Sequence, residues 1–174
     1  SGELITDKLA AKLWPNRCEN THKGDYGKLL ITAGSKGMTG AAVLAAQASL
    51  RIGTGLVTVG VPRSLNSILE TKLTEAMTYP LPSKQGVLAR AAKTNIEELM
   101  TDRDVLALGS GLTTQGGVEQ IINYVLNNIN KPLVIDADGI NAITDLNLLT
   151  TRTAPTVLTP HPGELARIMD KSIA

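Results

Sequence analysis

A histidine and a glutamate stand three residues apart in the stretch "TPHPGE", residues 159–164. The stretch marks the corner at which a short apolar run ends and a helical pattern begins. In a structural interpretation, Pro162 and Glu164 suit the first turn of a helix, the glutamate because it favours the positive end of the helix dipole. In a chemical interpretation, His161 donates to a phosphate or hydroxyl of a ligand while Glu164 holds a magnesium-bound water. The spacing leaves both interpretations open.

The loop "GSKGMTG", residues 34–40, follows the apolar run "KLLITA" and precedes a run rich in alanine. Its glycines would let backbone N–H groups approach a phosphate, and the following helix would aim its positive end at that anion. The same glycines would serve a tight strand-to-helix turn equally well. The spacing matches neither G-x-G-x-x-G nor G-x-x-x-x-G-K-[ST], so standard dinucleotide and P-loop sites lose support.

Two further loops carry glycine or polar residues after apolar runs. Gly109-Ser110-Gly111 is a weak signal, which fits either a sharp turn or a backbone that approaches a ligand closely. "DADGIN", residues 136–141, lacks the later ligands of a calcium loop. There, Asp138 could cap a helix, or a carboxylate or the side chain of Asn141 could bond a sugar hydroxyl or a metal-bound water. These alternatives stay open.

The elements around these loops alternate between strands and helices. The predicted strands are residues 28–33, 56–61, 76–81 (weakened by its prolines), 105–109, 132–137 and 156–159, and the predicted helices are residues 3–13 (stopped by Trp14-Pro15), 41–53, 63–72, 86–100, 116–129 and 162–170. Apolar strands separated by helices, with connections too long for hairpins, predict a mostly parallel sheet covered on both faces, a three-layer α/β/α sandwich.

Helix 41–53 is apolar on nearly every side, so we expect it to be buried. The four loops all follow strands. Because ligands bind beyond the carboxyl ends of the strands in such sheets, we expect the loops to form one site at that edge. His22 lies in a polar stretch before the first strand and is expected on the surface.

Composition narrows the class of protein. The 174 residues suit one domain, and the net charge of +1, with one tryptophan and three tyrosines, offers neither a basic stripe nor a stacking platform for nucleic acid. No apolar run reaches the roughly 18 residues of a membrane span, and no signal-peptide pattern is visible. Cys18 is the only cysteine, which excludes an intrachain disulfide and a cysteine zinc cluster. These features fit a cytoplasmic protein.

The four loops together resemble a known family. "HKGDYGKLLITAGSKGMTGAAVLAAQASLRIGTGLVTV", "LGSGL", "VIDADGINAI" and "VLTPHPGELARI" closely resemble the ADP- or ATP-dependent NAD(P)H-hydrate dehydratases of the ribokinase-like superfamily, from about Thr21 onward. The resemblance implies a repair reaction. Hydrated NADH or NADPH is phosphorylated on its new hydroxyl by ADP or ATP with Mg2+, and loss of phosphate returns the intact dihydronicotinamide.

The resemblance also implies site residues. Ala41, Gly111 and His161 match family positions that contact the hydrated dinucleotide, with the helix at Ala41 facing its pyrophosphate. Asn141 matches a polar position lining the same cleft, and Glu164 one on its phosphate and metal side, with no residue assigned as a direct metal ligand. The family often forms tetramers, and helix 41–53 could pack in such an interface or in the core.

The resemblance has one departure. Family members continue beyond the H-P-G-E helix with a lysine-glycine pair that contacts the nucleotide and a G-x-G-D turn whose aspartate is the base. No G-x-G-D occurs in this sequence, and neither Asp136 nor Asp138 can replace that aspartate. We therefore expect residues 1–174 to be a single ribokinase-like domain that is incomplete at its C-terminus, with no catalytic base of its own.

Such a chain would bind the dinucleotide weakly and show no turnover. Two other interpretations stay open. One is a non-catalytic dinucleotide-binding fragment or subunit. The other is a vitamin-precursor kinase of the same superfamily, such as a hydroxyethylthiazole kinase, although T-P-H-P-G-E and K-G-x-Y-G argue against it. A G-x-G-D encoded downstream would favour the dehydratase.

Overall fold

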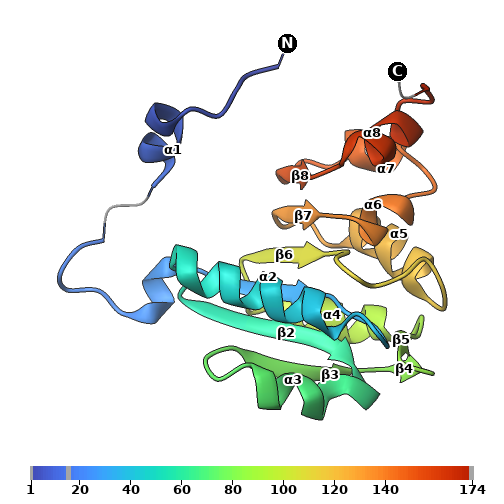
Figure 1. Ribbon diagram of the computed structural model, residues 1–174, viewed down its shortest axis with the longest axis horizontal. Coiled ribbons are helices and arrows are strands. Elements are labelled where there is room, and N and C mark those ends of the chain that lie inside the picture. The colour runs from blue at the N-terminus through green and yellow to red at the C-terminus, as the bar shows by residue number, and fades with distance from the viewer. Residues whose placement is uncertain (1, 15–16, 173–174) are drawn as a thin grey trace.

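The computed structural model describes residues 2–14 and 17–172, so Pro15, at which the first helix was expected to stop, lies outside the described residues. Six parallel strands form one sheet in the order β3-β2-β1-β6-β7-β8, as Figure 1 shows. Their bounds are β1 (Lys28–Thr32), β2 (Leu56–Pro62), β3 (Met77–Leu81), β6 (Val105–Leu108), β7 (Leu133–Ile135) and β8 (Thr156–Leu158). All six predicted strands are thus confirmed, each within two residues at its ends.

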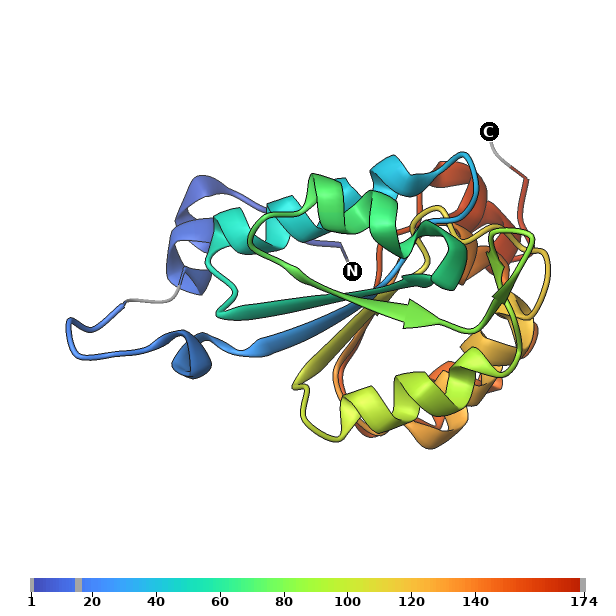
Figure 2. The same ribbon diagram turned by 90° about the horizontal axis from the view of Figure 1, so that it is seen from below.

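Helices lie on both sides of this sheet, which confirms the layered α/β class (Figure 2). One side carries α2 (Thr39–Ile52) and α3 (Asn66–Lys72), and the other carries α4 (Ala92–Met100) and α5 (Val118–Asn128). Each side has its own apolar cluster, built by α2 and α3 over β1 and β2 on one side and by α4 and α5 on the other. Burial of apolar surface in these clusters is the main stabilising contribution.

The coverage of the two faces is unequal among the described residues. On the α2 side, a cavity of about 400 Å3 opens over β1, β6 and β7 beside Ala45 and Ser49 of α2, and Ala107 and Val134 line its floor. Val157 on the edge strand β8 is 53% exposed. The expectation of a sheet covered on both faces therefore holds for β1 to β3. It is wrong for the part of the α2-side face that lies over β6 to β8.

Helix α2 also differs from its prediction. Only Ala42 and Ala46 are buried, whereas Leu44 is 69% exposed and Ile52 is 61% exposed. The prediction was wrong because small and apolar residues around the whole helix do not tell how many sides have a partner, and α2 has the sheet on one side only.

The predicted helix 86–100 is correct only over α4. Its first part, with the residues before it, forms a small antiparallel hairpin of β4 (Ser83–Lys84) and β5 (Val87–Leu88). Gln85 and Gly86 form its turn with φ of 54° and 81°, the positive values that a two-residue type I′ turn requires. The expectation that no connection is a hairpin is therefore wrong at this point.

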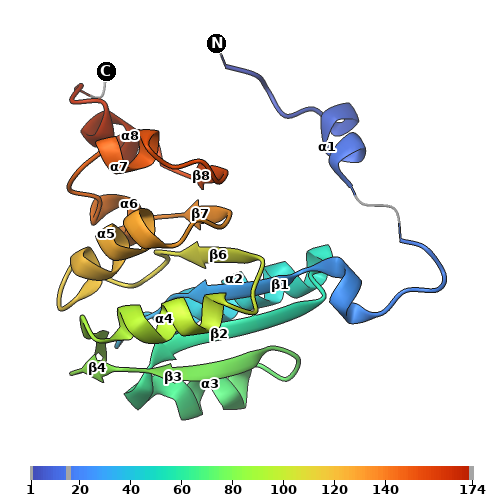
Figure 3. The same cartoon turned by 180° about the vertical axis from the view of Figure 1, so that it is seen from behind.

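The remaining elements are short. They are α1 (Asp7–Leu13), α6 (Asp138–Asn141), α7 (Asn147–Thr150), α8 (Pro162–Ile168), and the 3-10 turns η1 (Lys23–Tyr26) and η2 (Arg63–Leu65). Figure 3 shows α1 standing away from the sheet, and none of its residues is buried. Sequence reasoning missed α6 and α7. Within the described residues, no helix has the length and apolar character needed to span a membrane.

Candidate functional site

The carboxyl ends of β1, β6, β7 and β8 lie side by side, so the four predicted loops share one edge of the sheet (Figure 1). The chain winds from β1 toward β3 in one direction, and from β6 toward β8 in the other. The direction therefore reverses between β1 and β6. Open α/β sheets bind ligands in the crevice at such a switch point. The loops that flank it are residues 34–38 and 109–117.

Two of the predicted substrate contacts meet at this switch point. A Cβ added to Gly111 would lie 2.9 Å from Cβ of Ala41 and 3.1 Å from Cβ of Met38. Gly111 has φ of +66°, in the left-handed region that favours glycine. The loop after β6 can thus approach the first turn of α2 this closely because position 111 has no side chain.

The first turn of α2 is suited to an anion. Its N-cap is Met38, whose side chain makes no capping hydrogen bond. The N–H of Ala41 already donates to the carbonyl of Met38 at 3.2 Å. The donors for an anion in this turn are thus the N–H groups of Thr39 and Gly40, where the helix dipole adds positive charge. A phosphate placed beside Gly111 and Ala41 would therefore find donors and a favourable field. This agrees with the anion-cradle interpretation of the loop.

The loop that leads into α2 is held from both sides. The N–H of Gly34 donates to the carbonyl of Ser110 at 2.9 Å, and the N–H of Lys36 donates to the carbonyl of Gly86 at 2.9 Å. Ser35, between them, is 1% exposed, and its Oγ atom has no hydrogen-bond partner among the described residues. The hairpin that sequence reasoning missed is thus one of the two supports of this loop.

His161 and Glu164 cap α8 together. The N–H of His161 donates to Oε2 of Glu164 at 3.0 Å, and Nδ1 of His161 accepts from the N–H of Gly163 at 3.0 Å. Since Nδ1 accepts, the ring proton of a neutral His161 lies on Nε2, which faces Oε1 of Glu164 at 3.3 Å. Glu164 is 6% exposed. These contacts support the structural interpretation of the pair, and the roles of both residues toward ligands stay predictions.

The two aspartates of "DADGIN" have different partners. Asp136 accepts from the hydroxyls of Ser110 and Thr159, each at 2.7 Å. Asp138 accepts from the N–H of Thr113 at 2.9 Å. The N-cap of α6 is Ala137, so the capping role considered for Asp138 is wrong. Asn141 lies exposed at the end of α6, on the same edge of the sheet.

The exit from β7 is strained. Ala137 has φ of +47° and ψ of −119°, an unusual combination for a residue with a side chain, and such strain typically costs about 1–3 kcal/mol and collects at functional sites. Gly109 explains how the turn fits, because a Cβ there would lie 1.8 Å from the carbonyl oxygen of Asp136. The two glycines of "GSG" therefore have different roles. The missing side chain of Gly109 leaves room for the turn after β7, and that of Gly111 leaves room for Ala41.

The described residues do not form a magnesium centre. No group of three His, Cys, Asp or Glu side chains among them could hold a metal ion. Both oxygens of Glu164 are already engaged by His161.

A cavity of about 600 Å3 lies at the opposite end of the sheet. It opens between the segment 17–26 and the carboxyl end of α2, and Arg17, Lys23 and Arg51 are among its lining residues. It is basic, yet it adjoins the negative end of the α2 dipole and is far from the switch point. The fold therefore favours the first turn of α2, at the switch point, as the ligand site.

Sequence reasoning missed Ser110 and Thr159 as partners of Asp136 and missed Gly86. The glycine of the dipeptide Gln85-Gly86 was a usable turn signal. No signal in the sequence pairs Ser110 with Asp136, because the contact depends on the neighbourhood of β6 and β7.

Comparisons with known proteins agree with this geometry. A protein-family model described as NAD(P)H-hydrate dehydratase matches residues 29–174. The chain is 43% identical to the bifunctional NAD(P)H-hydrate repair enzyme Nnr of Moorella thermoacetica over 173 residues, which cover 98% of this chain and 33% of that protein.

Solved structures of related proteins have a similar fold. The ADP/ATP-dependent NAD(P)H-hydrate dehydratase of Bacillus subtilis, co-crystallised with ATP/Mg2+, has a TM-score of 0.74 and 29% identity, and the match covers 95% of this chain and 55% of that one. A ribokinase-like superfamily protein of Enterococcus faecalis, at 22% identity, has a TM-score of 0.76 over 94% of this chain and 55% of that one, which shows the ribokinase-like fold.

The chain thus spans about a third of the bifunctional relative and just over half of the solved dehydratase. The family model, however, matches most of the chain, and it includes all four loops at the switch-point edge. The chain belongs to the NAD(P)H-hydrate dehydratase family.

Proposed function

We propose that the protein containing this chain returns hydrated NADH or NADPH to the intact coenzyme, using ADP or ATP with Mg2+. The hydroxyl of the hydrate takes a phosphoryl group from the nucleotide, and loss of phosphate and a proton restores the ring double bond. Phosphorylation converts hydroxide, a poor leaving group, into a good one. The relatives' names support this proposal, since one is a repair enzyme for NAD(P)H hydrate and another an ADP/ATP-dependent dehydratase.

The close approach of Gly111 to Ala41 is the observation that carries the proposal. It places a side-chain-free backbone against the first turn of α2 at the switch point, and a helix N-terminus at such a point suits the pyrophosphate of a dinucleotide. His161 lies beyond β8 at the same edge, with its side chain 67% exposed. A ligand oxygen at His161 would share the Nε2 proton with Glu164.

In this proposal the chain supplies the dinucleotide half of the site. In the family resemblance, the base aspartate of the phosphoryl-transfer half belongs to a G-x-G-D turn, and residues 1–174 do not contain that motif. Asn141 lines the cleft, and Glu164 lies on its phosphate side. A homotetramer is the assembly we propose from the family resemblance.

A second candidate is a dinucleotide-binding module without catalysis. The observation that favours it is that no group of three His, Cys, Asp or Glu side chains among the described residues could hold a metal ion. The two candidates make the same prediction for binding and opposite predictions for turnover.

The deciding experiment uses the full-length protein with hydrated NADH and hydrated NADPH. ATP or ADP with Mg2+ is added, and the absorbance of the reduced nicotinamide is followed. We expect recovery of the absorbance that depends on the nucleotide. Binding of the hydrate without recovery, with either nucleotide, would contradict the dehydratase and support the binding module.

A further inference from the structure

Asp136 lies at the carboxyl end of β7, between the ends of β6 and β8, and a neighbour engages each of its carboxylate oxygens. Ser110 Oγ donates to Oδ2 and Thr159 Oγ1 donates to Oδ1, both at 2.7 Å. These lengths are typical of hydrogen bonds to a charged acceptor, which are about twice as strong as neutral ones. We propose that Asp136 is a positioning residue that clamps the two loops carrying Gly111 and His161, an inference that rests on the proposed function.

The clamp reaches both loops through short stretches of chain. Ser110 directly precedes Gly111, and Thr159 precedes His161 by two residues, with Pro160 fixing a backbone angle between them. The carbonyl of Ser110 also accepts the N–H of Gly34 at 2.9 Å. One chain of hydrogen bonds therefore joins the ends of β1, β6, β7 and β8, with Asp136 at its centre.

The backbone holds Asp136 in place from both sides. Its N–H donates to the carbonyl of Leu108 at 3.1 Å, and its carbonyl accepts the N–H of Gly139 at 2.9 Å. The strained Ala137 follows at once. Because these bonds fix the backbone of Asp136, its short side chain is directed toward Ser110 and Thr159.

The carboxylate also fixes the direction of two protons. An ionised aspartate can only accept, so the hydroxyl protons of Ser110 and Thr159 both point at Asp136. Thr159 has a second acceptor in the carbonyl of Ile135 at 3.5 Å, and the shorter contact to Asp136 sets its orientation. The oxygens of Ser110 and Thr159 are then left as acceptors for donor groups of a ligand.

The test measures KM for hydrated NADH and for ATP in the full-length protein. For Asp136→Ala we expect KM for the hydrate to rise about 10- to 100-fold, the range for lost hydrogen bonds to a charged group, with a smaller change in kcat and in KM for ATP. Asp136→Asn should be impaired clearly less than Asp136→Ala, because its amide oxygen accepts from one hydroxyl and its NH2 group donates to the other, although these neutral bonds are weaker.

Thr159→Val and Thr159→Ser give a second pair that perturbs folding less. The valine keeps the shape and loses the hydroxyl, and the serine keeps the hydroxyl. We expect a raised KM for the hydrate in the valine variant and recovery in the serine variant. An unchanged KM in both Asp136→Ala and Thr159→Val would overturn the clamp.

The remaining outcomes are equally decisive. If Asp136→Asn is as impaired as Asp136→Ala, the charge acts directly on a ligand or metal, and the clamp is wrong. If the wild-type protein does not convert the hydrate, the proposed function fails and the inference fails with it. If the wild type converts the hydrate and the variants keep its KM, the proposed function stands and only the role of Asp136 is wrong.

Discussion

The two ends of the sheet use polar groups in different ways. At the amino end, charged side chains bond one another and the backbone, and they join β1, β2 and β6 to the end of α4. At the carboxyl end, the strands run into glycine loops that approach one another closely, and the carboxylate of Asp136 accepts hydrogen bonds from two hydroxyls. The first arrangement is suited to stability and the second to binding.

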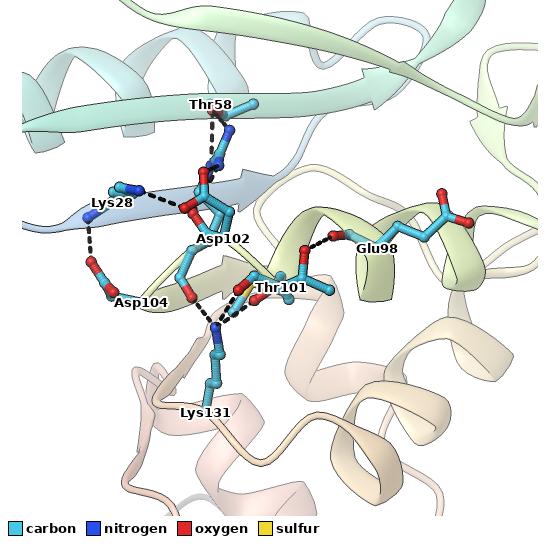
Figure 4. A network of polar contacts seen from close by, with 9 residues as sticks. Lys28, Thr58, Glu98, Thr101, Asp102, Asp104 and Lys131 are labelled. Carbon is cyan, nitrogen blue, oxygen red and sulfur yellow. Dashed lines mark hydrogen bonds and ion pairs between the residues drawn. The ribbon is translucent and has the colours of Figure 1, made fainter. Parts of the chain in front are cut away.

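Figure 4 shows the network at the amino end. The ammonium group of Lys28 pairs with Asp102, and the Lys28 N–H donates to Asp104 at 2.7 Å. The guanidinium of Arg103 donates to Thr58 Oγ1 at 3.1 Å across β1. Lys131 donates to three carbonyls at the end of α4. The positive charge of Lys131 also interacts favourably with the negative end of the α4 dipole.

The comparison predicts that substitutions at the two ends affect different properties. Carboxyl-end changes should weaken ligand binding more than stability. Amino-end changes should lower stability and leave the ligand affinity of the folded protein unchanged.

The largest effect is expected for Gly111→Ala in the full-length protein. The new Cβ would lie 2.9 Å from Cβ of Ala41, so the loop or α2 must shift at the predicted pyrophosphate site. We expect Kd for hydrated NADH to rise about 10- to 100-fold, since displacements of about 1 Å at a site have effects of this size. Isothermal titration calorimetry measures it.

Gly27→Ala is the matched control, because Gly27 has φ of +80° and a Cβ there would meet its nearest atom at an ordinary 3.8 Å. Both variants place alanine at a positive φ and strain the backbone, and Gly27, with ψ of 159°, lies in a region almost confined to glycine. Equal losses of affinity in the two variants would show that backbone strain, and not the contact with Ala41, weakens binding.

An intermediate effect is expected for Lys131→Met. The variant leaves the carbonyls of Met100, Thr101 and Arg103 without the ammonium donor. We expect the free energy of unfolding to fall by about 1–3 kcal/mol, measured by urea denaturation, with Kd for the hydrate unchanged. The exposed Lys84 gives the control variant Lys84→Met. If Lys131→Met changed Kd for the hydrate and left stability unchanged, the amino end would serve binding, and the assignment of stability to that end would be wrong.

The sheet and the edge shared by the four loops followed from the sequence, and the pairing within the edge did not. Apolar strands and the loops after them indicated the class of fold. The family resemblance pointed to Ala41 and Gly111, which the structure brings together. The clamp around Asp136 depends on which strands are neighbours, which no local pattern of Ser110 or Thr159 encodes. The prediction of a helix over residues 86–100 was wrong in its first part. The apolar periodicity of residues 83–88 is weak, and Gly86 favours a turn there.

The smallest effect is expected from pH at Asp102. The hydrogen bond and charge of Lys28, with help from Arg103, lower the pKa of Asp102 below its ordinary value of 3.8. The unfolded chain thus takes up the proton first, so the stabilisation is present above about pH 4 and is lost as pH falls through the lowered pKa. Asp102 is 69% exposed, so the gain is small.

Asp102→Asn should therefore lower the urea midpoint slightly at neutral pH and flatten its decrease below about pH 4. Identical acid branches for the variant and the wild type would show that the Lys28 pair contributes nothing to stability.

The position of the bound dinucleotide tests the central claim most directly. A crystal structure of the full-length protein with hydrated NADH would locate the pyrophosphate. We expect it within hydrogen-bond distance of the first-turn N–H groups of α2, beside Gly111. A pyrophosphate bound in the basic cavity by Arg17, Lys23 and Arg51 would place the ligand at the amino end and contradict the assignment of the two ends.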